Sequence, residues 1–264
     1  VGLLDEFGPG RVLDTPISEA GIMGTGVGAA LTGMRPIVEI MFGDFIPIAM
    51  DQIVNQAAKM CYMTGGQAKV PLTIRTTIGA GRSSAAQHSQ SLHAWLSHIP
   101  GIKVAIPSTP ADLKGLLKTA IRDDNPTVIY EDKMMYSLKG DVPEGDDFTI
   151  PFGVADIKRV GTDVSLVATS SMVHTALNAA KILEKEGISV EVVDPRSLSP
   201  LDKDTIIQSV IKTSRAVVID EAYQSYGITG ELASIIHDEA FDYLDAPVKR
   251  IGAMDVPVPF SPGL

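Results

Sequence analysis

The sequence predicts a two-domain α/β fold in which each domain is a mostly parallel sheet flanked by helices. Short stretches rich in β-branched residues alternate with helix-patterned stretches in both halves, as in chains that build parallel sheets with right-handed crossovers. A polar segment separates the halves, and the chain is 45% hydrophobic, which is enough for packed cores. We therefore expect one domain over 1–136, a linker over 137–151 and a second domain over 152–264.

The first half is expected to supply four strands, each bounded by turn residues. They are Pro36–Met41, Pro71–Thr76, Lys103–Ile106 and Thr127–Glu131. The clearest helix is Ala111–Arg122, whose apolar residues recur at the spacing of one buried stripe. Thr109 can cap this helix, and Pro110 suits its first position.

The second half repeats this pattern. Its expected strands are Val164–Thr169, Ser189–Asp194, Ala216–Glu221 and Val248–Ile251. Val173 and Leu183 mark the apolar stripe of one helix, and Ile228 and Ile236 mark another. A third helix is expected to begin at Ser199-Pro200, with the same cap chemistry as Thr109-Pro110.

The segment 137–151 contains glycines, prolines and several acids and has no apolar period, which is typical of a linker. The alternative is a long surface loop within a single domain. The linker is the better interpretation because each half supplies its own set of strands.

Composition excludes several classes of function. The formal charge of −10 argues against nucleic acid as a main partner, because phosphate binding needs a basic surface. A single cysteine, Cys61, excludes an internal disulfide framework and a multi-cysteine zinc site, and we expect it to be buried and structural. No apolar run reaches the ~18 residues of a membrane span. The chain begins at Val1 rather than methionine, so it is expected to be a fragment or a processed form.

Glycines and an acid stand near the start of the chain. The segment GTGVGA at 24–29 fits a dinucleotide-binding pattern, but only the stub Val12-Leu13 precedes it, so close packing inside a helix is the favoured interpretation. Ser18 can cap that helix, which places Glu19 in its first turn. A surface acid that favours the helix dipole is the simpler explanation of Glu19, and a site at a buried interface is the alternative.

The loop 79–90 follows a predicted strand and carries His88 between two glutamines. Long loops at the carboxyl ends of parallel strands are where α/β proteins place ligand sites, so a catalytic His88 and a merely solvated one are equally supported. His88, His93 and His98 are spaced by five residues, which does not align three metal ligands on a helix. Asp220 and Glu221 close a predicted strand and are interpreted as structural.

The turn RDDNP at 122–126 ends a helix. Its last carbonyl oxygens have no helical partners and are able to hold a cation. A solvated helix end, stopped by proline, is the simpler prediction.

Longer stretches resemble a known family. They are DTPISEAG at 14–21, MDQIVNQAAK at 50–59, AAQHSQS at 85–91, HIPGIKVAIPSTPADLKGLL at 98–117 and RDDNPTVIYE at 122–131. These look like the β subunit of the first, thiamine-diphosphate-dependent component of 2-oxo acid dehydrogenase complexes of the pyruvate, acetoin and branched-chain type. The second half, with EGISVEVVDPRSLSPLD and VIDEAYQSYGITGELA, is similar to that family's transketolase-type C-terminal domain. The family extends beyond both ends of this chain.

The resemblance implies roles for particular residues. Glu19 matches a glutamate that hydrogen-bonds a pyrimidine nitrogen of thiamine diphosphate and so helps the cofactor lose a proton from its reactive carbon. Phe45 matches an aromatic residue that packs on the pyrimidine ring, and His88 matches a histidine that positions the substrate or lipoyl group and transfers protons. Met41 and Phe45 stand where branched-chain members tend to carry glutamine and tyrosine, which favours a pyruvate or acetoin enzyme.

The resemblance also implies a metal site. Leu72, Ala120, Asp123 and Asn125 match positions that bind potassium through backbone or side-chain oxygens in some members.

The phosphate half of the cofactor has no visible site. Thiamine enzymes hold magnesium and the diphosphate with a Gly-Asp-Gly motif followed further along by asparagine, and this chain has only Gly43-Asp44-Phe45 with Asn55 too close. The resemblance therefore implies an α subunit that holds magnesium and the diphosphate in an α2β2 heterotetramer with β–β contacts. A lipoyl-bearing acyltransferase core would accept the acyl group.

The bacterial cytoplasm is the expected compartment, or the mitochondrial matrix if the source is eukaryotic. The alternatives are half of a self-sufficient transketolase-like enzyme and an inactive, truncated structural subunit.

Overall fold

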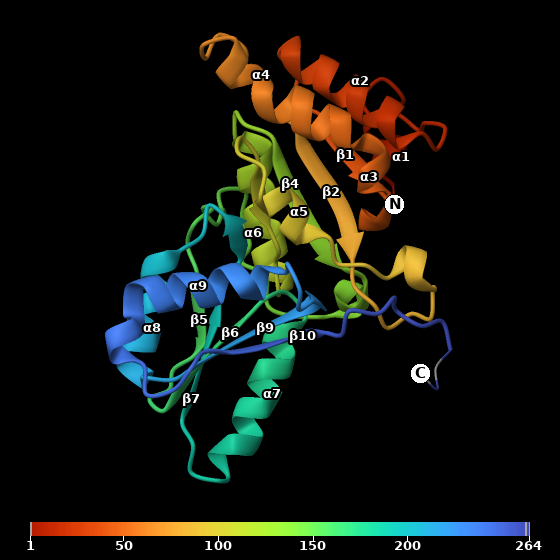
Figure 1. Ribbon diagram of the computed structural model, residues 1–264. Coiled ribbons are helices and arrows are strands. Elements are labelled where there is room, and N and C mark those ends of the chain that lie inside the picture. The colour runs from red at the N-terminus through yellow and green to blue at the C-terminus, as the bar shows by residue number, and fades with distance from the viewer. Residues whose placement is uncertain (1, 262, 264) are drawn as a thin grey trace.

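The computed structural model describes residues 2–261 and 263 and contains two five-stranded, mostly parallel sheets with helices on their faces (Figure 1). The two-domain α/β prediction is confirmed. Within the described residues, none of the helices has both the length and the apolar character that a membrane crossing needs.

The first sheet has the order β1-β2-β4-β3-β8. Its strands are β1 (Ile37–Ile40), β2 (Thr73–Ile78), β4 (Thr127–Asp132), β3 (Lys103–Ala105) and β8 (Ser197–Ser199). Strands β1 to β4 are parallel, and β2 and β4 pair along their whole length from Thr73 opposite Thr127. The helices around this sheet are α1 (Leu3–Phe7), α2 (Glu19–Leu31), α3 (Ile46–Met50), α4 (Ala58–Met63), α5 (His93–Ser97) and α6 (Pro110–Arg122).

Helices α3 and α4 are joined by a π-helical segment, Asp51–Ala57, against which α2 packs. Helix α6 begins as predicted: the Thr109 hydroxyl accepts a hydrogen bond from the Asp112 amide, and Leu116 and Ala120 on its apolar stripe are buried. Cys61 lies inside α4 and is only partly buried, so the expectation of a fully buried thiol is wrong.

The second sheet has the order β10-β9-β6-β7-β5. Its strands are β5 (Asp156–Arg159), β6 (Val164–Ala168), β7 (Val190–Asp194), β9 (Ala216–Tyr223) and β10 (Lys249–Ala253). Helix α7 (Met172–Glu184) packs on β6 and β7, while α8 (Lys203–Thr213) and α9 (Ile228–Ala240) pack together against β6, β7, β9 and β10. The apolar stripes predicted for α7 and α9 face these buried surfaces.

The start of α8 differs from the prediction. Ser199 lies in strand β8, and the Ser199-Pro200 peptide bond is cis, so neither residue opens a helix. Asp202 caps α8 instead, because its carboxylate accepts a hydrogen bond from the Thr205 amide. A carboxylate three residues ahead of a free backbone N–H satisfies one of the unpaired donors at a helix start.

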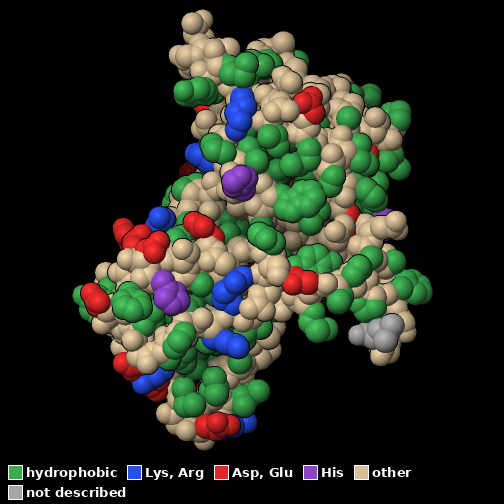
Figure 2. Space-filling view, viewed as in Figure 1, with side chains coloured by type: hydrophobic (Ala, Val, Ile, Leu, Met, Phe, Trp, Pro, Cys, Tyr) green, Lys and Arg blue, Asp and Glu red, His purple; other side chains and the backbone are tan. Residues whose placement is uncertain are grey.

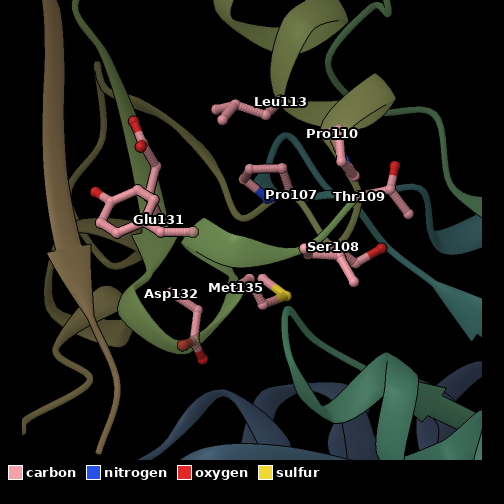
Figure 3. Close-up of a pocket in the computed structure, with 10 residues that line it drawn as sticks. Pro107, Ser108, Thr109, Pro110, Leu113, Glu131, Asp132 and Met135 are labelled. Carbon is pink, nitrogen blue, oxygen red and sulfur yellow. The ribbon is translucent and has the colours of Figure 1, made fainter. Parts of the chain in front are cut away.

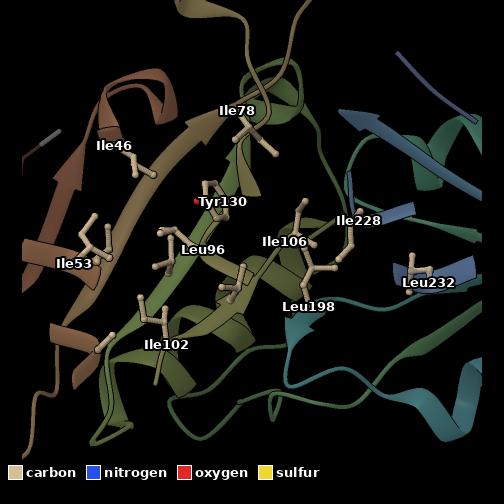
Figure 4. Packing of buried hydrophobic residues seen from close by; sticks show 14 of the residues in the cluster. Ile46, Ile53, Ile78, Leu96, Ile102, Ile106, Tyr130, Leu198, Ile228 and Leu232 are labelled. Atoms are coloured by element: carbon tan, nitrogen blue, oxygen red, sulfur yellow. The ribbon is translucent and has the colours of Figure 1, made fainter. Parts of the chain in front are cut away.

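Two short antiparallel edge strands, β5 and β8, were not predicted. Strand β8 comes from the second half of the chain but pairs with β3 of the first sheet. The largest hydrophobic cluster is therefore continuous across both sheets, with Ile106 and Leu198 leading from Tyr130 toward Ile228 and Leu232 of α9 (Figure 4). The domain limits 1–136 and 152–264 remain predictions. Strand β8 lies within 152–264 in the sequence but belongs to the sheet formed by residues of 1–136.

The segment 138–155 contains no helix or strand and runs along α6. Lys114 Nζ donates to the Pro143 carbonyl at 2.7 Å, and Thr119 Oγ1 donates to the Ile150 carbonyl at 2.7 Å. Ile150 is buried against α6, where a Cβ on Gly115 would lie 2.6 Å from its Cγ1 atom. This segment is docked on the first domain rather than extended between the two.

Candidate functional site

A cluster of three rings lies at the carboxyl end of the first sheet. The chain leaves β1 through Phe42 and turns at Gly43, where a Cβ would meet the Thr77 carbonyl at 2.7 Å, so only glycine fits. Phe42 and Phe45 then meet the imidazole of His88, which lies in the loop after β2, with ring centroids 4.8 and 5.3 Å away in edge-to-face geometry. We call Phe42, Phe45 and His88 the aromatic cluster. The structure thus brings together the predicted residues Phe45 and His88.

Phe42 was missed by the sequence analysis. Its ring lies 6.1 Å from that of Phe45 and 5.3 Å from the Lys133 ammonium, which is within cation–π range. Phe42 stands next to Met41 and three residues before Phe45, and this position was the sequence signal that could have identified it. A single phenylalanine after a strand is usually part of the hydrophobic core, so the signal was not followed.

Polar groups fix the backbone on both sides of His88. Lys133 Nζ donates to the His88 carbonyl at 2.6 Å, and Asp44 Oδ1 accepts from both the amide and the side chain of Gln90, at 3.1 and 3.0 Å. Burial lowers the pKa of Lys133, although the nearby carboxylates of Asp44 and Asp132 oppose this. The loop is thus held through its backbone on both sides of the imidazole, and the His88 ring nitrogens have no hydrogen-bond partner among the described residues.

Glu19 is the first residue of α2, as predicted, with Ser18 at the cap position. The Ser18 side chain makes no cap hydrogen bond, so its expected capping role is wrong. Glu19 is partly buried, and within residues 2–261 and 263 its carboxylate has no hydrogen-bond partner. Helix α2 packs against α3, which follows Phe45 directly, so Glu19 and the aromatic cluster stand on neighbouring elements. A carboxylate left without a protein partner is available to a ligand.

Met41 lies just past the end of β1. Its carbonyl accepts a hydrogen bond from Thr77 Oγ1 at 2.8 Å, and its side chain is half exposed. Ile17, at 75% exposed, and Ile48, at 57% exposed, add apolar surface on the segments that flank α2. Hydrophobic side chains are visible over these helices at the top of the space-filling view (Figure 2).

The glycines at 24–28 lie inside α2, and the described residues ahead of them, from Gly2 on, form no strand. A Cβ on Gly26 would lie 2.6 Å from Val38 Cγ2, so this residue allows the helix to approach β1 closely. The packing interpretation is confirmed, and the dinucleotide pattern at 24–29 is coincidental.

Comparisons with known proteins decide the family. The chain matches the model of the transketolase pyrimidine-binding domain over residues 1–139 and that of the transketolase C-terminal domain over 153–264. The chain belongs to the transketolase family. Its relatives in that family include the β subunit of acetoin:2,6-dichlorophenolindophenol oxidoreductase from Bacillus subtilis (strain 168), which is 57% identical over all of this chain and 77% of its own length.

Two further relatives are β subunits of the pyruvate dehydrogenase E1 component. That of Rhizobium meliloti (strain 1021) is 50% identical over all of this chain and 57% of its own length. The mitochondrial beta-2 subunit of Oryza sativa subsp. japonica is 49% identical over all of this chain and 71% of its own length. A solved structure described as a split gene transketolase, an inactive β4 tetramer, superposes with a TM-score of 0.79 at 28% identity and covers 97% of this chain and 79% of its own. The chain is therefore of the E1 β-subunit type, and its cofactor is thiamine diphosphate.

The turn after α6 is partly solvated, as predicted, since Arg122 and Asn125 are exposed, but two of its carbonyl oxygens also have a side-chain partner in this transketolase-family chain. Arg35 Nη1 donates to the carbonyls of Ile121 and Asp123, at 3.2 and 2.9 Å, and Lys103 Nζ lies 2.5 Å from the Asp123 carboxylate. Although burial opposes it, the hydrogen bond from Lys103 lowers the pKa of Asp123. Asn125 donates to the same carboxylate.

The predicted potassium residues lie at the amino end of the first sheet. The Leu72 carbonyl accepts from the Thr127 amide at 2.8 Å, and the Ala120 carbonyl accepts from the Asp123 amide at 3.2 Å. The aromatic cluster lies beyond the carboxyl end of β2, so these residues belong to a different edge of the domain. Potassium binding there remains a prediction.

A hollow of about 200 Å³ lies beside the end of β4 (Figure 3). It is lined by Pro107, Ser108, Thr109, Pro110, Leu113, Glu131, Asp132, Met135, Tyr136 and Leu138. Arg75 neutralises Glu131 through two hydrogen bonds of 2.7 and 3.0 Å, and burial raises the pKa of Tyr136. Asp132 is the other carboxylate of the lining, and its Oδ1 atom accepts from the Met134 amide.

Proposed function

We propose that the chain is the β subunit of an acetoin- or pyruvate-cleaving dehydrogenase whose active site is completed by an α subunit. The observation that carries the proposal is that Glu19, whose carboxylate has no partner among the described residues, stands on an element next to the contacting rings of Phe45 and His88, in a domain that matches the transketolase pyrimidine-binding model. Acetoin is favoured over pyruvate because the acetoin relative is 57% identical to this chain, against 50% for the Rhizobium pyruvate enzyme.

The residues fit the pyrimidine half of thiamine diphosphate. Glu19 would accept a hydrogen bond from the pyrimidine ring, and Phe45 and Met41 would cover the ring with apolar surface. Thiamine diphosphate, when bound, supplies a carbon nucleophile and an electron sink. His88 would hold or move a proton at the substrate oxygen, a task that suits an imidazole near neutral pH.

The phosphate half needs another chain. We infer that an α subunit supplies the magnesium and diphosphate site, in an α2β2 heterotetramer with a β–β contact. Ile17 just before α2, Met41 just after β1 and Ile48 in α3 are exposed, and burying such apolar surface favours association. A lipoyl-bearing acyltransferase core would then receive the acyl group.

The compartment and the potassium site complete the proposal. Relatives occur in a bacterium and in a plant mitochondrion, so we place the enzyme in the bacterial cytoplasm, or in the mitochondrial matrix if the source is eukaryotic. Potassium held by Leu72, Ala120, Asp123 and Asn125 would stabilise the turn after α6 rather than take part in chemistry.

Co-expression with an α subunit of this family tests the function. The purified complex should reduce 2,6-dichlorophenolindophenol when given acetoin, and more slowly when given pyruvate, only in the presence of thiamine diphosphate and magnesium. The chain alone should be inactive with both. Activity of the chain alone would favour the self-sufficient transketolase-like alternative, and no activity of a well-formed complex would favour the structural one.

A further inference from the structure

Two neighbouring acids of the second domain reach both ends of the His88 loop. Asp220 and Glu221 stand near the carboxyl end of β9, and successive side chains of a strand point to opposite sides. Glu221 Oε1 accepts from the Ala80 amide at 2.5 Å, where the loop begins. Asp220 Oδ2 lies 2.8 Å from His93 Nε2, where the loop ends at the start of α5.

The loop between these contacts has a strained backbone. Gly79 and Gly81 have φ values of 100° and 93°, and Ser83 and Ala85 also lie in the left-handed region, at 50° and 64°. Residues other than glycine adopt this region only where the surroundings hold them there. External anchors are therefore needed to keep His88 in one position.

The anchor at Asp220 is buried and well satisfied. Asp220 is 4% exposed and His93 is 0% exposed, and Thr169 Oγ1 donates to the second oxygen of Asp220 at 2.6 Å. Although burial opposes it, the neighbouring His93 and the hydrogen bond from Thr169 lower the pKa of Asp220. Both oxygens of the Asp220 carboxylate are bonded, while His93 Nδ1 is buried without a hydrogen-bond partner among the described residues. A buried pair of this kind fixes geometry rather than contributing much net stability.

The anchor at Glu221 faces a second acid. Asp132, at the end of β4, is 2% exposed and lies against Glu221, and its Oδ1 atom caps the following turn by accepting from the Met134 amide. A Cβ on Gly79 would lie 3.0 Å from this same Asp132 carboxylate, so loop, β4 and β9 meet at one point. The second domain thereby contacts the first at the base of the loop.

We propose that Asp220 and Glu221 are positioning residues, through which the second domain clamps the two ends of loop 79–93 and so sets the place of the His88 imidazole. This inference rests on the proposed role of His88. It gives the second domain a part in catalysis without contact with substrate or cofactor, and it replaces the view of both acids as merely structural.

Glu221→Ala and Glu221→Gln test the clamp in the co-expressed α–β complex. Glu221→Ala removes the acceptor for Ala80, so amide exchange across 80–92 should become faster by about tenfold or more. A displacement of a catalytic group by about 1 Å can cost on the order of 100-fold, so kcat should fall toward that extent while KM changes little. Glu221→Gln keeps a carbonyl oxygen for Ala80 and should restore both quantities to within a few-fold of wild type.

Asp220→Asn and Glu186→Ala complete the series. Asp220→Asn keeps one acceptor oxygen for His93 and should speed exchange at the loop's end, with a smaller loss of kcat. Glu186 is an exposed acid of the same domain, and Glu186→Ala should match wild type in exchange and turnover. The clamp is refuted if Glu221→Ala exchanges like wild type, or if Glu186→Ala loosens the loop equally. An inactive wild-type complex would instead refute the proposed function. The hydrogen-exchange data would still show whether Glu221 holds the loop.

Discussion

Alanine substitutions at two glycines of α2 should have different effects on stability. At Gly26 a new Cβ would lie 2.6 Å from Val38 Cγ2 and 3.2 Å from Leu72 Cδ1, and both neighbours are buried. At Gly28 a new Cβ would have no atom within 4 Å. The two sites share one helix, so the gain in helix propensity on replacing glycine, about 1 kcal/mol, is common to both.

The difference between the variants isolates the packing cost. Overfilling a well-packed core typically costs about 1–3 kcal/mol, because side chains or backbone must shift. Gly28→Ala should therefore stabilise the chain by about 1 kcal/mol, while Gly26→Ala should be about 1–3 kcal/mol less stable than Gly28→Ala. At about 2–4 °C per kcal/mol for a protein of this size, the two melting temperatures should differ by roughly 2–12 °C.

Thermal unfolding of the purified chain, followed by far-UV circular dichroism, measures both variants against wild type. Equal melting temperatures for Gly26→Ala and Gly28→Ala would refute the close approach of α2 to β1. The result also bears on the site, because the same helix carries Glu19 at its start.

Three further predictions concern the site and its surroundings. Calorimetric titration with thiamine diphosphate and magnesium should show very weak binding to the chain alone and tight binding to the α–β complex; tight binding without a partner would contradict the shared site. His88→Ala should lower kcat of the complex by roughly 10²–10⁴-fold with little change in cofactor affinity, as expected for loss of a proton-transfer group; an unchanged kcat would remove His88 from the mechanism. Burial and the facing Asp132 raise the pKa of Glu221 from 4.5 to about 7, so the protonated form is favoured on folding and stability is lost as pH rises from about 4.5 through 7. Glu221→Gln cannot ionise, so its free energy of unfolding relative to that of wild type should rise by on the order of 3 kcal/mol between pH 4.5 and 8. Asp220, Lys133 and Arg82 also face this site. Parallel curves of unfolding free energy against pH, measured by urea unfolding, would contradict the raised pKa.

Local sequence patterns predicted the elements that have strong periodicity. The stripe and the Thr109 cap of α6 act within one helix, so both could be predicted from neighbouring residues. The error at Ser199 has a different origin, because Ser199 takes part in a sheet formed with β3, almost a hundred residues earlier in the chain. Pairing between distant strands leaves no local signal in a strand of three residues, two of them serines, such as β8.

The site residues also divide into those predicted from sequence motifs and those that only long-range packing brings together. Glu19, Phe45 and His88 were predicted through the resemblance of their motifs, and the structure brings Phe45 and His88 into contact. Spacing alone could not show that Asp220 and Glu221 meet the His88 loop, since those contacts join residues 127 and 141 positions apart. Only the packing of the two domains creates them.

Turnover of the reconstituted α–β complex with Glu19→Gln tests the central claim most directly. The amide keeps the size of the side chain but removes the carboxylate that we assign to the pyrimidine ring. The shared-site account predicts that acetoin- and pyruvate-dependent reduction of 2,6-dichlorophenolindophenol is abolished in this variant, while the complex still assembles. A kcat close to that of wild type would show that Glu19 does not serve the cofactor and would contradict the account.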